Sequence, residues 1–188
     1  AAVLAVVLAR VAALTSHTVE LPPNVGGVVG LSLLTGLVGP PEAGKSSSTG
    51  IGRDLVLAPS GHTIADGLPL GSGEGLSEVL FGMVTEDDPQ TGKPTKVRRQ
   101  VRHSALVAVD EGTLLAELSQ RRGSTTLTTL RSIFTHGTIG ATNATAERNR
   151  VVAGTDYVYG VVVGIQPALA GPLFEPAAIG DGTPQRFL

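Results

Sequence analysis

Residues 31–48 read LSLLTGLVGPPEAGKSSS, and this stretch decides the expected fold. Its first eight residues are mostly apolar and short in extent, as expected for a buried strand. They lead into the pattern G-x-x-x-x-G-K-[ST], in which Gly39, Gly44, Lys45 and Ser46 occupy the fixed positions. A strand, a glycine-rich loop and a helix that starts near Gly44 together predict a phosphate-binding loop.

Each residue type in this loop has a chemical reason. Glycine lets the backbone turn its N–H groups toward a polyphosphate. Lys45 is expected to reach the β- and γ-phosphates, and the Ser46 hydroxyl to ligate Mg²⁺. The expected nucleotide-binding residues are Gly39, Pro40, Pro41, Glu42, Ala43, Gly44, Lys45, Ser46 and Ser47. The stretch therefore predicts a site for ATP and Mg²⁺, with the Glu42 carboxylate pointing to solvent. The alternative interpretation is a turn followed by a solvated lysine.

A second apolar run, Ala105 to Val109, ends in the acidic pair Asp110 and Glu111. Acids at the carboxyl end of a buried parallel strand face the crevice in which such sheets bind ligands. There Asp110 can hold Mg²⁺ through water, and Glu111 can orient or deprotonate an attacking water molecule. The alternative is a strand that ends in two solvated acids.

A third apolar run extends from about Tyr157 to Ile165 and is followed by Gln166. At this edge of a sheet, we expect Gln166 to sense the γ-phosphate; the alternative is a loop residue held by backbone hydrogen bonds. Arg186 stands after the turn GDGTPQ and can reach a nucleotide, often that of a neighbouring subunit. The alternative for Arg186 is a surface salt bridge to Asp181 or Glu175.

Composition sets broad limits on the chain. The 188 residues are 41% hydrophobic and 16% charged, which is typical of one globular domain with a sizeable core. The net charge of −2 gives no global electrostatic reason to bind nucleic acid. Cysteine is absent, which excludes disulfides and thiolate metal sites and fits a cytoplasmic location. The four histidines show no spacing typical of metal ligands.

The opening AAVLAVVLARVAAL, residues 1–14, resembles a targeting or membrane segment in composition. Arg10 interrupts it, and it is shorter than the roughly 20 apolar residues that span a bilayer. A packed helix is therefore expected, with no membrane partner. We expect residues 1–25 to form this helix and a linker, and residues 26–188 a single nucleotide-binding core. Because the chain starts without Met and ends on the apolar QRFL, we expect a fragment of a longer protein.

The remaining patterns complete an α/β prediction. Helices are expected at about Gly44–Leu57 and Leu76–Phe81, and helical spacing resumes after the acidic pair with Leu114, Leu115 and Leu118. Residues 85–103 are polar with turn signals and predict an exposed hairpin or loop. Its basic residues, Lys96, Arg98, Arg99 and Arg102, could contact DNA phosphates or pair with the acids of TEDD. Alternating strands and helices predict a three-layer sandwich with a mainly parallel sheet.

Several stretches together carry a resemblance to a known family: GPPEAGKSS, DGLPLGSGEGL, VRHSALVAVDEGTLLAEL, GATNATAERNR, GIQPALAGPLF and GDGTPQRFL. The chain resembles the helicase-like P-loop ATPase domain found beside primase-polymerase modules in phage and plasmid replication proteins, in its actinobacterial form. The resemblance implies a RecA-like sheet and ATP-driven action on DNA. It also implies a homo-oligomeric ring or filament in which Arg186 contacts a neighbour's γ-phosphate, with a primase-polymerase module as a further partner.

Three functions remain open from the sequence. The first is a DNA-dependent ATPase or helicase motor. The second is a nucleotide kinase or another P-loop phosphotransferase, which would need an arginine-rich lid that the sequence does not offer clearly. The third is a nucleotide-binding regulator that barely hydrolyses ATP. The pair Asp110 and Glu111 argues against the third, because hydrolysis requires a second acid beside the one that holds magnesium.

Overall fold

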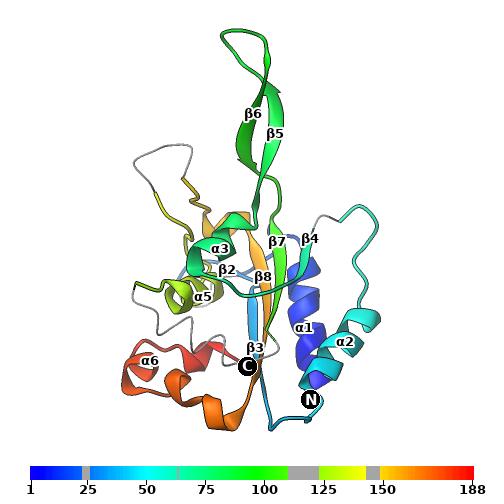
Figure 1. The fold of residues 1–188 in the computed structure, drawn as a ribbon, viewed down its shortest axis with the longest axis vertical. Helices are drawn as coiled ribbons and strands as arrows, with labels where there is room; N and C mark the ends of the chain where they lie inside the picture. The colour runs from blue at the N-terminus through cyan, green and yellow to red at the C-terminus, as the bar shows by residue number, and fades with distance from the viewer. Residues whose placement is uncertain (23–25, 63, 110–122, 143–148) are drawn as a thin grey trace.

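The computed structural model describes residues 1–22, 26–62, 64–109, 123–142 and 149–188. Its centre is a four-stranded, all-parallel sheet (Figure 1). The strands are β3 (Leu33–Val38), β4 (Ile64–Leu68), β7 (Ser104–Val109) and β8 (Val158–Ile165), in the order β3-β8-β7-β4. All four carboxyl ends therefore lie on one edge, at the bottom of Figure 1, and the expected mainly parallel sheet is confirmed.

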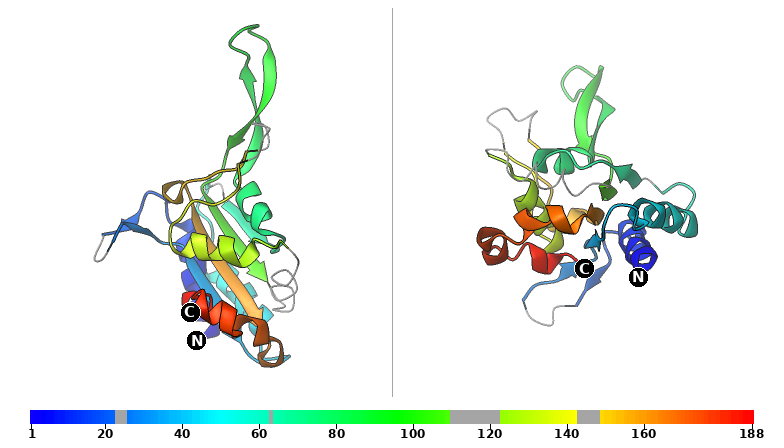
Figure 2. Two further views of the ribbon diagram at one scale, coloured as in Figure 1. Left: turned by 90° about the vertical axis from the view of Figure 1, so that its left-hand side faces the viewer. Right: turned by 60° about the horizontal axis from the view of Figure 1, so that its bottom comes forward.

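Helices cover both faces of this sheet, as the right-hand view of Figure 2 shows. One face carries α1 (Ala2–Leu14), which contacts three of the strands, and α2 (Lys45–Leu55), which packs on α1. The other face carries α3 (Gly73–Glu78), α5 (Thr126–Phe134) and α6 (Pro176–Gly180). Short 3₁₀ turns complete this side at Gly154–Asp156, Pro167–Leu169, Gly171–Leu173 and Pro184–Arg186. The result is a mixed α/β arrangement compatible with the expected sandwich.

The first helix belongs to the packed body of the protein. Val6, Ala9 and Ala13 of α1 are buried against Leu37, Leu106 and Val162 of the sheet. The helix α1 approaches β8 closely because the facing residues are small. A Cβ on Gly160 would lie 2.1 Å from the Ala9 carbonyl oxygen. No described helix is long and apolar enough to cross a membrane. The expected packed helix over residues 1–14 is confirmed.

Arg10, which interrupts the apolar N-terminal run, is buried on the inner side of α1. Its guanidinium lies 2.8 Å from Oδ1 of Asp66 in β4, and its Nε donates to the carbonyl of Val56 at the end of α2. The pair joins three elements that are far apart in sequence. Arg10 therefore fixes the position of α1 on the sheet and does not disrupt the helix.

The opposite face of the sheet holds the larger core, which includes Tyr159 of β8 and Tyr157 just before it. Tyr157 and Tyr159 lie edge to face, with ring centres 5.6 Å apart. Their hydroxyls donate to the carbonyls of Gly137 and Leu76, respectively, so that β8 is tied to the helical layer. Burial raises the pKa of both phenols far above the usual value, so both remain neutral hydrogen-bond donors.

Two antiparallel hairpins stand outside the central sheet. The small one pairs β1 (Glu20–Leu21) with β2 (Val29–Gly30), where the sequence predicted only a linker. The long one pairs β5 (Phe81–Asp87) with β6 (Pro94–Gln100) over seven residues of each strand. It confirms the expected exposed hairpin and projects from the amino edge of the sheet, at the top of Figure 1.

The predicted elements can now be compared with the observed ones. The three predicted strands correspond to β3, β7 and β8, and the helix expected at Gly44–Leu57 corresponds to α2. The helix expected at Leu76–Phe81 is displaced: α3 ends at Glu78, and Phe81 already starts β5. The displacement has a local cause, because the Ser72 hydroxyl accepts a hydrogen bond from the Gly75 N–H and caps the helix earlier than expected. The helical spacing at residues 114–118 lies outside the described residues.

Candidate functional site

The predicted phosphate loop joins β3 to α2 at the carboxyl edge of the sheet. Its first residue is held by a strand neighbour, because the Gly39 N–H donates to the Ile165 carbonyl at 3.0 Å. Its last residue, Gly44, adopts a left-handed backbone (φ +78°) and is the N-cap of α2. The strand, loop and helix expected from the sequence are therefore all present in the expected order.

Lys45 is the first residue of α2, and its ammonium folds back across the loop. Nζ lies 2.8 Å from the Gly39 carbonyl oxygen and 2.7 Å from that of Pro40. Both partners are neutral, and none of the ion pairs found among the described residues includes Lys45. The loop therefore presents a positive charge that an anion can neutralise.

The start of α2 adds further groups that suit an anion. The first backbone N–H groups of any helix lack partners within the helix, and the helix dipole places partial positive charge there. Ser46 and Ser47 are exposed at this end. Residues 42–47, Lys45 among them, line a hollow of about 190 Å³. This geometry can bind a phosphate chain.

Ser46 is the described residue that fits a magnesium ion. Its exposed hydroxyl lines the hollow next to Lys45, and Mg²⁺ in nucleotide sites takes most of its oxygen ligands from phosphates and water. The second expected ligand, Asp110, lies outside the described residues, as does Glu111. Within the described residues, no group of three or more His, Asp or Glu side chains is placed to hold a metal.

Phosphate loops favour glycine or another small residue at the position of Glu42, and the backbone conformation explains why. Its φ is +64°, in the left-handed region where side chains other than glycine are disfavoured by about 1 kcal/mol. The side chain is exposed and lines the hollow, so its negative charge stands beside the expected phosphate position. The Glu42 charge therefore disfavours an anion in the hollow, and its backbone conformation costs stability.

The strand that leads to the acidic pair ends on the same edge as the loop. Val109, the last residue of β7, is level with Val163 of β8, which is level with Gly36 of β3. Two strand spacings separate β7 from β3, or about 10 Å. The predicted juxtaposition of Lys45 and Asp110 on one edge is consistent with this register, although Asp110 itself is not among the described residues.

Gln166 follows β8 directly and is half-buried. It stands next to Ile165, whose carbonyl holds the Gly39 N–H, so the structure brings Gln166 to the start of the phosphate loop. Its own carbonyl accepts the Leu169 N–H at 2.9 Å, as the N-cap of a short 3₁₀ turn. The backbone role is therefore observed, and the sensor role of the Gln166 side chain stays a prediction.

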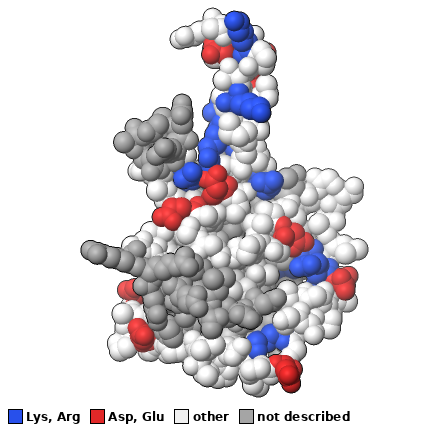
Figure 3. Space-filling view, in the orientation of Figure 1, with Lys and Arg blue, Asp and Glu red and all other residues white. Residues whose placement is uncertain are grey.

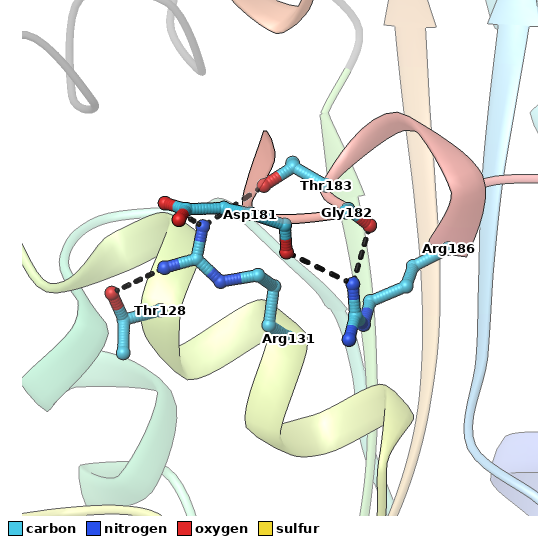
Figure 4. Close-up of polar contacts among 6 residues, drawn as sticks. All are labelled: Thr128, Arg131, Asp181, Gly182, Thr183 and Arg186. Carbon is cyan, nitrogen blue, oxygen red and sulfur yellow. Dashed lines mark hydrogen bonds and ion pairs between the residues drawn. The ribbon is translucent and has the colours of Figure 1, made fainter. Parts of the chain in front are cut away.

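Arg186 lies elsewhere. Its guanidinium donates to the main-chain carbonyls of Asp181, at 3.2 Å, and Gly182 (Figure 4). The Asp181 carboxylate is taken by Arg131 of α5 at 2.9 Å, so the carboxylate salt bridge considered for Arg186 is not the one formed. Phe187 pairs in parallel with Leu34, and Gly39 is about 17 Å further along β3. Arg186 is therefore remote from the loop of its own chain.

The chain path points to the same edge of the sheet as a place for a ligand. After β3 the chain crosses to β4 over the face that carries α1 and α2. After β8 it leaves over the opposite face, where Arg131 of α5 bonds to Asp181 and Thr183. In open parallel sheets, ligands bind outside the carboxyl ends of adjacent strands whose connections diverge in this way. By this rule, a ligand is expected at the carboxyl ends of β3 and β8, next to the phosphate loop and Gln166.

A second hollow, of about 340 Å³, was not anticipated from the sequence. It gathers His17, His62 and His103 with Arg102 at the amino ends of the strands. The rings of His17 and His103 are stacked, with centres 4.2 Å apart, and His103 Nδ1 lies 2.9 Å from the Asp156 carbonyl oxygen. These residues are up to 86 positions apart in the chain, so no local motif indicates the cluster.

Comparison with known proteins adds no relative: neither a protein-family model nor a curated protein matches this chain. The candidate site thus rests on its own residues and geometry.

Proposed function

We propose that the chain is an ATP-binding and ATP-hydrolysing motor domain of the RecA-like P-loop type that acts on DNA. One observation carries the nucleotide part of this proposal. The Lys45 ammonium lies across a loop that joins a buried parallel strand to a helix start, and it is held there by two neutral carbonyl oxygens. A cation that has no counter-ion among the described residues, beside the first N–H groups of a helix, is suited to bind phosphate oxygens.

The strand order supports hydrolysis in addition to binding. β8 lies between β3 and β7, so Gln166 and the acidic pair both follow strands that run to the edge where the loop lies. In the proposed reaction Lys45 binds the β- and γ-phosphates, and Ser46 and Asp110 hold Mg²⁺, which neutralises charge on the phosphate oxygens when bound. Glu111 accepts a proton from water as the water oxygen bonds to the γ-phosphorus. The bond to the bridging oxygen breaks and leaves ADP and phosphate.

The DNA part of the proposal rests on the resemblance to helicase-like domains of replication proteins. This resemblance implies that ATP turnover is coupled to a nucleic acid, and that residues of one subunit complete the ATP site of its neighbour. In such an assembly Arg186 would serve a neighbouring protomer, since about 17 Å of β3 separates the position paired with Phe187 from the loop of its own chain.

ATP turnover with and without single-stranded DNA tests this proposal, together with the variant Glu111→Gln. We expect DNA to stimulate turnover. Glu111→Gln should retain nucleotide binding but lose turnover by roughly 10²-fold or more, because an amide cannot accept the proton. Transfer of phosphate to a small molecule without DNA would instead identify a phosphotransferase. Equal loss of binding and turnover in Glu111→Gln would show that this residue is structural.

A further inference from the structure

The long hairpin formed by β5 and β6 is an arm that extends away from the body of the protein (Figure 1). Phe81, at its base, packs against the main core, but no later residue of the arm belongs to either described core cluster. A two-stranded ribbon has little stability of its own in water. An arm of this length, which adds almost nothing to the core, is suited to contact a partner.

Positive charge runs along this arm. Four basic residues, Lys93, Lys96, Arg98 and Arg99, lie on β6 and the turn that precedes it, and in Figure 3 blue side chains follow the arm from tip to base. Arg99 is neutralised by Glu86, with both contacts at 2.8 Å, and Arg98 pairs with Glu78. For Lys93 and Lys96, no side-chain partner is present among the described residues.

The strand register separates the two faces of the arm. Met83 pairs with Arg98 and Thr85 with Lys96, so these side chains share a face, which we call the groove face. The Glu86–Arg99 pair lies on the opposite face. On the groove face, Met83 is 62% exposed and Arg98 lies over the Phe81 ring at 5.3 Å. The groove face thus combines the Lys96 ammonium, which has no side-chain partner among the described residues, with the exposed Met83, while the Arg98 charge is compensated by Glu78.

A hollow of about 550 Å³ is lined by the groove-face residues Phe81, Met83, Lys96 and Arg98, and also by Thr95, Val97 and Asn149. Single-stranded nucleic acid has the complementary chemistry, because its phosphates attract cations while its unpaired bases can rest on apolar side chains and on arginine. Lys96 can meet a phosphate, whereas Arg98 is held by Glu78 and lies over Phe81, so that it belongs to the wall of the hollow. Duplex DNA would use the cations but leave Met83 and Phe81 without a role.

We propose that the groove face of the arm, with Lys96 and Met83 as its contact residues, binds single-stranded DNA. This inference rests on the proposed DNA-dependent function and locates the DNA contact within it. The arm projects from the amino edge of the sheet, whereas the phosphate loop lies on the carboxyl edge. The arm therefore contributes to DNA affinity and takes no part in phosphate chemistry.

The test is fluorescence anisotropy of fluorescein-labelled oligo(dT) with the full chain over a series of KCl concentrations. Lys96→Gln removes one cation from the groove face, and the matched control, Arg99→Gln, removes one from the opposite face. Lys96→Gln should reduce the slope of log Kd against log salt by about 0.7, the value for one phosphate contact on a single strand. Met83→Ser should weaken binding several-fold without changing that slope, and Arg99→Gln should change neither.

Equal effects of Lys96→Gln and Arg99→Gln would overturn the proposal, since only overall charge would then matter. It would also be overturned if Lys96→Gln and Met83→Ser bound oligo(dT) like the wild-type protein; the proposed motor function would survive that result. ATP binding and DNA-free turnover should be unchanged in all three variants. Wild-type protein that binds ATP but not oligo(dT) would refute both the arm site and the DNA part of the proposed function, and would leave the nucleotide site standing.

Discussion

Replacement of Arg10 by Met should destabilise the protein strongly, although Arg10 lies outside the candidate site. The Arg10 residue is 2% exposed, and its guanidinium lies 2.8 Å from Oδ1 of Asp66 while Nε donates to the Val56 carbonyl. Methionine keeps most of the apolar volume of the side chain. It removes the charge and the hydrogen bonds that join α1 to β4 and to the end of α2, and leaves Asp66 unpaired.

The expected loss follows from the burial of the two partners. Removal of one member of a buried ion pair costs about 3–5 kcal/mol. The Asp66 side chain is 30% exposed, so water partly solvates the orphaned carboxylate, and we expect a value near the lower end, about 3 kcal/mol. For a chain of this length, each kcal/mol lowers the melting temperature by about 2–4 °C, so the expected decrease is about 6–12 °C.

Urea unfolding and thermal melting followed by circular dichroism measure this loss. The matched control is Arg99→Met, because the Arg99–Glu86 pair has the same 2.8 Å separation but its side chains are 61% and 41% exposed. The control should leave the urea midpoint almost unchanged, since exposed ion pairs contribute little. Equal decreases in the two variants, or none in Arg10→Met, would refute the reasoning that burial makes the Arg10–Asp66 pair important.

Three further predictions concern the loop, the histidine cluster and Arg186. Glu42→Gln should tighten ATP binding several-fold by removal of a negative charge beside the hollow, as calorimetry can show; weaker binding would contradict this. Glu42→Gly should in addition stabilise the fold by about 1 kcal/mol in urea unfolding, because glycine relieves the left-handed backbone. Burial and the nearby His103 lower the pKa of His17, so the unfolded chain binds the proton more readily. The free energy of unfolding should therefore fall as pH drops below about 6.5. His17→Gln should flatten the plot of urea midpoint against pH, and an unchanged plot would show that His17 is not the source of the pH dependence. Arg186→Ala and Lys45→Ala should each be inactive and regain partial ATPase activity when mixed, whereas normal turnover by Arg186→Ala alone would restrict Arg186 to its carbonyl contacts.

The sequence predicted the elements whose signal is local. The apolar runs of β3, β7 and β8 and the glycine-lysine pattern at residues 39–46 each act within a few residues, so their positions followed from the residues alone. β4 was not predicted, because its IADGL sequence is short and half-buried and is fixed by parallel pairing with β7. The hairpin of β1 and β2 was missed for the same reason, since two residue pairs give almost no periodic signal.

The candidate site was predictable in part. The loop residues carry a motif, but which strand lies beside the loop depends on the order of the whole sheet, and that order placed Gln166 next to Gly39. The partner of Arg10 is 56 residues away, and the partners of Arg186 are main-chain carbonyls rather than the carboxylates that the sequence suggested. Contacts of this kind are decided by tertiary packing and leave no pattern in the chain.

The central claim is that Lys45 binds the phosphates of a nucleotide. Isothermal titration calorimetry of MgATP into the wild-type protein, Lys45→Ala and the matched control Lys93→Ala tests it most directly. Lys93 is an exposed lysine on the arm, away from the phosphate loop. The account predicts that the wild type and Lys93→Ala bind MgATP alike and that Lys45→Ala loses most of the affinity. MgATP binding of equal strength in Lys45→Ala, or no binding by the wild-type protein, would contradict it.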